Sequence, residues 1–222
     1  MWKSIRYKEW IKTRWFVMLY AFLGLSVVAY MFLIVHRNFK FTDASSYWYE
    51  LIFMGASYFS ILKFVPLAGG LVLSLAQYFP EIVNKRIKLS FHLPVNENRV
   101  LMMMMLYGTI SLLLIYTIIL GAFWGISCIY FPSDIYMRAI ISVAPWFLAG
   151  FAAYYLTALI VLEPVWKYRL GYFIVAIVFN TMYFKASDAG AYAPVNIWLG
   201  FLVTISSVSL LFSGYRFRKG EM

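Results

Sequence analysis

Six apolar stretches, separated by shorter charged segments, make up most of this 222-residue chain. They cover residues 15–36, 51–75, 100–127, 139–162, 170–184 and 189–215. A helix needs about 20 apolar residues to cross a ~30 Å hydrocarbon core, and most of the stretches reach that length. The fifth is shorter, but Arg169 and Lys185 at its ends can extend their charges outward along their aliphatic stems. The pattern predicts an all-α, polytopic membrane protein, a single transmembrane domain over residues 1–222 with six transmembrane helices.

Basic residues fall mainly into alternate connecting segments, and this gives an expected orientation. One set of segments holds fourteen of the 19 Lys and Arg residues: Lys3, Arg6, Lys8, Lys12, Arg14, Lys85, Arg86, Lys88, Arg99, Lys167, Arg169, Arg216, Arg218 and Lys219. The other set holds Arg37, Lys40, Arg138 and Lys185, and Lys63 lies inside a stretch. Because Lys and Arg accumulate on the cytoplasmic side, both termini are predicted to be cytoplasmic.

Composition supports the membrane assignment. Hydrophobic residues make up 64% and aromatic residues 21% of the chain, whereas charged residues at 13% are about half the usual share. The net charge of +10 is explained by basic loops beside anionic membrane lipid, so it implies no nucleic-acid partner. The first apolar run carries no small-residue cleavage motif, so no removable signal peptide is expected. Because no loop is long enough for a soluble domain, we expect the protein to act within the membrane or through a partner.

The N-terminal segment, residues 1–14, is too charged to insert into the bilayer. Its apolar and aromatic residues alternate with five basic ones. As a helix it would lie in the interface, with Lys and Arg facing anionic lipid. The alternative is an ordinary basic flank of the first span. A helix that bends into that span would favour the interfacial elbow.

Residues 77–98 predict a short amphipathic helix on the cytoplasmic side. Pro80 and Glu81 suit its first turn, because proline needs no hydrogen bond there and an acid meets the positive end of the helix dipole. Its apolar edge recurs at four-residue spacing: Val83, Ile87 and Phe91. Leu93 is disfavoured in a helix because Pro94 follows it. So short a helix needs a surface to pack against, either lipid headgroups or a partner protein.

Glu81, the amphipathic stretch and then Leu93-Pro94-Val95 lead directly into the third of six spans. This arrangement resembles the permease subunits of ATP-binding-cassette exporters of the second type. In that family the acidic residue and the Leu-Pro-Val-like motif belong to a coupling helix that docks in a groove of the ATPase, and an interfacial elbow helix precedes the first span. The resemblance covers the topology of the whole chain and a motif of about 20 residues.

The resemblance implies a transmembrane subunit of an ATP-driven exporter in the cytoplasmic (inner) membrane of a prokaryote. This chain has no GxxxxGK[ST] phosphate loop, so ATP and magnesium would be held by a separate ATPase subunit and no cofactor by this chain. Permeases of this type work in pairs, which implies a second copy or a related permease. Membrane lipid is the remaining expected partner.

The polar residues argue against an enzyme. His36 and His92 are predicted on opposite sides of the membrane, and no Asp or Glu lies inside a predicted span. Cys128 has no soft metal ligand nearby in the sequence, and the acids lack metal-ligand spacing. We therefore expect no catalytic residues and no metal site, because catalysis needs converging titratable groups.

Lys63 is the one ionisable residue deep inside a predicted span. A lysine there costs about 2.5 to 3.5 kcal/mol on insertion scales, so it is a candidate for the translocation path, where it would meet an anionic substrate or lipid. It could equally be paired with backbone carbonyls near Pro66, or the centre of the span could lie later in the chain.

Two other function classes stay open. A secondary transporter or channel-like protein could use the interrupted second span as its site, although no carboxylate is available there for ion coupling. A membrane scaffold or immunity protein would transport nothing. After the fourth span, Glu163-Pro164 predicts a tight turn with a solvated acid, which could also contact an ATPase.

Overall fold

The structure, a computed structural model, describes residues 2–41, 43–83, 97–185 and 190–218. The described residues form helices and turns, with no strand. In chain order the helices are α1 (Trp2–Phe41), α2 (Ala44–Phe53), η1 (Ser60–Phe64), α3 (Val65–Val83), α5 (Glu97–Tyr130), α6 (Ser133–Leu162), α7 (Trp166–Thr181), η2 (Met182–Phe184) and α8 (Asn196–Arg218).

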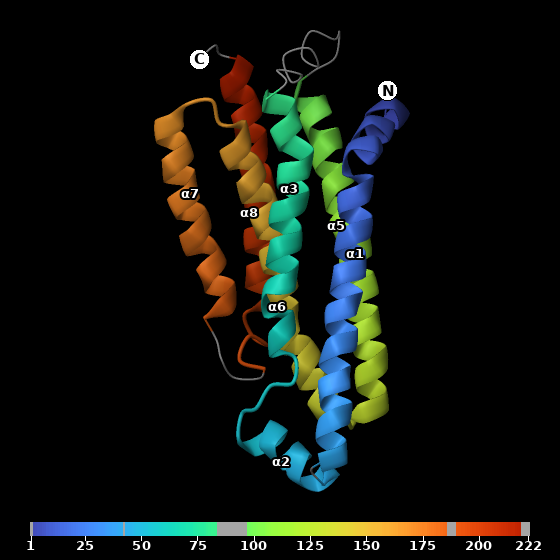
Figure 1. The fold of residues 1–222 in the computed structure, drawn as a ribbon. Coiled ribbons are helices and arrows are strands. Elements are labelled where there is room, and N and C mark those ends of the chain that lie inside the picture. Colours follow the sequence, from blue (N-terminus) through green and yellow to red (C-terminus); the bar gives the residue numbers. More distant parts are fainter. Residues whose placement is uncertain (1, 42, 84–96, 186–189, 219–222) are drawn as a thin grey trace.

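The long helices lie side by side, and the short helix α2 lies across the bundle at one end (Figure 1). The start of α1 and the end of α8 are both at the opposite end, on different sides of the bundle, and this end is called the N-terminal end below (Figure 1). Helix α6 is the centre of the bundle and packs against α3, α7 and α8, whereas α1 packs mainly on α5. In the most apolar part of α6, 72% of the residues are buried, against 22% in α1.

Four helices among the described residues are long and apolar enough to cross a membrane: Lys3–Phe41, Ser60–Val83, Arg99–Tyr130 and Ser133–Leu162. The apolar part of α8, Asn196–Leu210, is shorter. The predicted all-α, multi-pass membrane protein is therefore confirmed. Six spans and cytoplasmic termini stay predictions.

The second apolar stretch, residues 51–75, is not one helix, which differs from the sequence prediction. Helix α2 ends at Phe53, and Gly55 has φ +70°, a left-handed conformation that interrupts a helix. The chain becomes helical again at Ser60 and stays so to Val83, with Pro80 inside the helix. Hydropathy misplaced this element because its last turns carry polar residues that are buried against neighbouring helices.

Helices α3 and α6 approach each other closely at two glycines. A Cβ atom on Gly70 would overlap the Gly150 carbonyl oxygen, and one on Gly150 would overlap the Tyr116 hydroxyl. Small residues at such a crossing let helix backbones pack tightly, a common device between membrane helices. The Tyr116 hydroxyl also donates a hydrogen bond of 2.7 Å to the Pro66 carbonyl, which ties α5 to the start of α3.

An aromatic cluster holds together the end of the bundle opposite the N-terminal end. Tyr58, in the irregular segment before η1, has its ring centroid 4.5 Å from that of Phe131 and 6.0 Å from that of Phe123. Phe32 of α1 packs against Tyr58 and Phe123 from the other side. These contacts fix the segment between α2 and α3 against α1 and α5.

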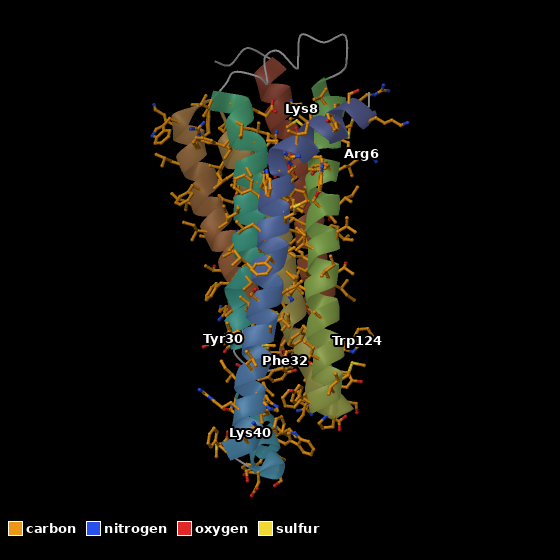
Figure 2. The ribbon with its side chains drawn as sticks, turned by 45° about the vertical axis from the view of Figure 1, so that its right-hand side comes forward. Arg6, Lys8, Tyr30, Phe32, Lys40 and Trp124 are labelled. Carbon is orange, nitrogen blue, oxygen red and sulfur yellow. The ribbon has the colours of Figure 1, made fainter. Side chains whose placement is uncertain are left out.

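The N-terminal segment is helical and continuous with the first long helix, since α1 begins at Trp2 and is not interrupted. Its first turns tilt away from the axis of the rest of α1 (Figure 1), which is the bend expected of an elbow helix. Arg6 and Lys8 lie at the N-terminal end and Lys40 at the opposite end (Figure 2). The position of the segment in the membrane interface stays a prediction.

Candidate functional site

Two acids and two lysines form a compact cluster at the N-terminal end, between α1 and α3. We call Lys8, Glu9, Lys12 and Glu81 the ion-pair cluster. The Lys12 ammonium lies 2.9 Å and 3.0 Å from the two carboxylate oxygens of Glu9, and 3.1 Å from Oε1 of Glu81. The same Glu81 oxygen lies 2.9 Å from Nζ of Lys8. Both acids are buried, Glu9 at 0% and Glu81 at 1% exposed.

Helical spacing brings these side chains together. Lys8 and Lys12 are four residues apart on α1 and so share one face, where they meet Glu81 of α3. Glu9, three residues before Lys12, holds that lysine from the side of its own helix. One turn later, the Thr13 hydroxyl lies 2.9 Å from the Tyr107 hydroxyl of α5 and donates a 2.8 Å hydrogen bond to the Glu9 carbonyl.

Gln77 is a further buried polar residue, one turn before Glu81 on the same face of α3. Its amide nitrogen donates to the Met104 carbonyl of α5 at 2.7 Å, and its amide oxygen accepts from the Tyr154 hydroxyl of α6 at 2.7 Å. Gly108 makes room for this contact, because a Cβ atom there would overlap the Tyr154 hydroxyl. The ion-pair cluster and Gln77 therefore connect α3 to α1, α5 and α6.

The geometry of the cluster is suited to holding α1 and α3 together. Its two positive and two negative charges balance, and each buried carboxylate has an ammonium group within 3.1 Å. A buried charge that keeps its partners is tolerated, whereas removal of one partner is costly. The cluster therefore links the N-terminal turns of α1 to the last turn of α3 at the point where residues 84–96 begin.

The cluster corrects two sequence expectations. Pro80 and Glu81 belong to the last turns of α3, not to the first turn of a separate helix, because α3 continues to Val83. Lys8 and Lys12 were expected to face anionic lipid together with the other basic residues of the segment, but they pair with Glu81. Their four-residue spacing beside Glu9 is the sequence signal that could have indicated an ion pair.

Only part of the predicted coupling element is described. Val83, the first residue of its apolar edge, ends α3 and is 60% exposed. Ile87, Phe91, Leu93 and Pro94 lie outside the described residues. Their docking role stays a prediction.

Lys63, the candidate for the translocation path, lies in η1, just before α3 begins. It is half-buried, and its ammonium lies 5.7 Å from the ring centroid of Phe64 and 6.0 Å from that of Phe184. The 19 residues of α3 extend about 28 Å from it toward the N-terminal end. Lys63 thus lies near one end of the candidate membrane helix Ser60–Val83, not at its middle, and its role in a translocation path stays a prediction.

Glu163 differs from its expected solvated position. It follows the last residue of α6 and is fully buried. Its backbone carbonyl accepts a 2.8 Å hydrogen bond from Nη2 of Arg169, whose guanidinium lies 5.6 Å from the centroid of the Trp166 ring. The turn between α6 and α7 is therefore packed against the bundle.

Among the residues that the structure describes, no three His, Cys, Asp or Glu side chains gather where they could hold a metal ion. Comparison of the chain with protein-family models, with curated proteins and with solved structures found no match.

Proposed function

We propose that this chain is the transmembrane permease subunit of an ATP-driven exporter. In this proposal it crosses a prokaryotic cytoplasmic membrane six times with both termini inside, and it works with a second copy or a related permease. ATP and magnesium are bound by a separate ATPase subunit. The proposal is supported by the multi-pass helical architecture and by the resemblance of residues 81–95 to the coupling element of such exporters.

The observation that carries the proposal is the ion-pair cluster. A loop that receives movement from an ATPase can pass it on only if the helix before it is fixed to the rest of the bundle. Lys8 and Lys12 fix the last turn of α3 through Glu81, within three residues of the start of residues 84–96. Gln77 extends the attachment to α5 and α6.

In the proposed mechanism, closure of the ATPase dimer pushes on residues 84–96 and moves α3 together with the N-terminal turns of α1. Because α3 packs tightly on α6 at Gly70 and Gly150, the displacement reaches the centre of the bundle. Packed helices transmit strain in this way because protein interiors are dense and resist compression. Repeated closing and opening of the ATPase would then open the substrate path alternately to one side of the membrane and to the other.

The test is co-purification of an ATPase with the tagged chain in mild detergent. Burial of apolar side chains such as Ile87 and Phe91 contributes roughly 1.5 to 3 kcal/mol each, before ordering costs. The double change Ile87→Asp with Phe91→Asp replaces that gain with unpaired buried charge, so it should abolish co-purification. The matched control Asn84→Asp with Asn96→Asp adds the same charge to the same segment without altering the apolar edge, and should retain the ATPase.

Two results would contradict the proposal. Retention of the ATPase at wild-type level by the Ile87, Phe91 double variant would show that this segment does not dock on the ATPase. Absence of any ATPase from the wild-type sample, with the chain intact and folded, would remove the exporter assignment itself.

A further inference from the structure

A cavity of about 880 Å³ lies between α3, α6 and α7. Its size is within the range of sites that bind small organic ligands. The walls are mainly aliphatic and aromatic: Leu67 and Leu71 of α3, Leu156 and Ile160 of α6, and Phe173 and Ile177 of α7. Phe173 and Ile177 are 53% and 51% exposed, so the cavity opens to the surroundings of the bundle. In a membrane those surroundings are lipid.

The end of the cavity away from the N-terminal end carries positive charge. Lys185 lines it. Lys63 stands at its rim, because its ammonium lies 5.7 Å and 6.0 Å from the ring centroids of Phe64 and Phe184, which both line the cavity. Neither lysine has a carboxylate within ion-pair distance among the described residues.

One polar group inside the wall also lacks a partner in the described part of the chain. Asn180 of α7 donates its amide N–H to the Ala176 carbonyl at 2.8 Å, but its amide oxygen is buried and accepts no hydrogen bond there. Buried polar atoms of this kind are usually satisfied, so Asn180 marks a polar position behind the apolar wall.

A membrane that α3 spans would bring its headgroups to the level of Lys63. Lys63 lies two residues before α3 begins, and the roughly 28 Å length of α3 matches the ~30 Å thickness of a hydrocarbon core. A ligand anchored at Lys63 and Lys185 would therefore place its charge at the membrane surface. Any tail would run along the apolar walls of the cavity toward the N-terminal end.

We infer that this cavity is a binding site for one anionic phospholipid, with its phosphate at Lys63 and Lys185 and an acyl chain between α3, α6 and α7. A free inorganic anion would leave the apolar walls unused, and an uncharged lipid would bring no net negative charge to the two lysines, which have no carboxylate partner among the described residues. The inference is independent of the proposed exporter function, since it is argued from the cavity and its rim alone.

The experiment uses photo-activatable phosphatidylglycerol and photo-activatable phosphatidylcholine, each at low content in phosphatidylcholine vesicles that contain the full chain. We expect the phosphatidylglycerol probe to label α3, α6 and α7 along the cavity more strongly than the phosphatidylcholine probe does. A basic residue beside anionic lipid contributes about 1 kcal/mol, so Lys63→Met with Lys185→Met should lower the affinity for the phosphatidylglycerol probe roughly thirtyfold. Lys40→Met is the matched control, because Lys40 lies at the same end of the bundle on α1 and does not line the cavity.

A second variant tests the apolar part of the site. Ile177→Trp fills the cavity from α7 without changing the lysines, and should reduce phosphatidylglycerol labelling at the cavity while labelling of α1 is unchanged. Equal labelling of the wild type and the double lysine variant would overturn the inference, because it would indicate ordinary lipid contact. Competition by millimolar inorganic phosphate would indicate a free-anion site. Disulfide formation between copies through Ile177→Cys, without lipid labelling, would show that a second copy occupies the cavity.

Discussion

Glu81→Gln tests the ion-pair cluster, because it removes a buried negative charge and keeps the shape of the side chain. The change takes from Lys12 one of its two carboxylate partners and from Lys8 its ion pair with Glu81. Hydrogen bonds to charged groups contribute about 1.5 to 3 kcal/mol, whereas the contact with the 40% exposed Lys8 side chain is partly screened. Lys12 keeps its contacts with Glu9. We therefore expect Glu81→Gln to lower the free energy of unfolding by about 2 kcal/mol.

The assay is thermal unfolding in detergent, followed by the fluorescence of the protein's 8 Trp residues. For a chain of this size, 1 kcal/mol corresponds to about 2 to 4 °C, so the midpoint should fall by about 4 to 8 °C. Glu50→Gln is the matched control: Glu50 is exposed on α2, and its loss should change stability by less than about 0.5 kcal/mol.

A double-mutant comparison makes the test specific to the contact. Lys8→Met should lower the midpoint in the wild-type background and have a smaller effect when Glu81→Gln is already present, since neighbouring partners are not additive. An unfolding midpoint for Glu81→Gln within 1 °C of that for the Glu50→Gln control would refute the role of the cluster in holding α1 and α3 together. Equal effects of Lys8→Met in both backgrounds would do the same.

Two further predictions concern the packing and the orientation of the bundle. Gly150→Val should separate α3 from α6, with an overpacking cost of about 1 to 3 kcal/mol and a lower midpoint in the same assay, whereas Gly121→Val, at a glycine with open space beside it, should have a smaller effect. In a cysteine-free background, Ser45→Cys should react with an impermeant thiol reagent added to intact cells and Ser4→Cys should react only after permeabilisation. Both side chains are exposed, at opposite ends of the bundle. Labelling of Ser4→Cys in intact cells would contradict cytoplasmic termini.

The order and class of the long helices were predictable from hydropathy, because lipid-facing helices must be apolar over most of their length. The position at which α3 ends was not predictable from hydropathy. Gln77 and Glu81 lower its local hydropathy, and their partners on α1, α5 and α6 are distant in the sequence. An average of hydropathy over a sliding window shows neither that pairing nor the left-handed Gly55 that separates α2 from α3.

The candidate site was predictable only in part. Glu81 was identified from its place before the Leu-Pro-Val motif, but its lysine partners were assigned to lipid because basic residues near a span usually face headgroups. Lys63 was placed at mid-membrane because the apolar stretch was assumed to be one helix. Its actual position, at the rim of a cavity with Lys185, depends on the packing of α7 against α6, which leaves the cavity between α7 and α3.

The proposed coupling to an ATPase is tested most directly by crosslinking in intact cells. A photo-reactive amino acid at Phe91 should crosslink to a protein that carries a phosphate-binding GxxxxGK[ST] loop, identified by mass spectrometry of the adduct. The same amino acid at Ile197, 85% exposed near the start of α8 and away from the N-terminal end of the bundle, should give no such adduct. Crosslinking of Phe91 to lipid alone, in cells that express the chain at normal levels, would contradict the exporter assignment.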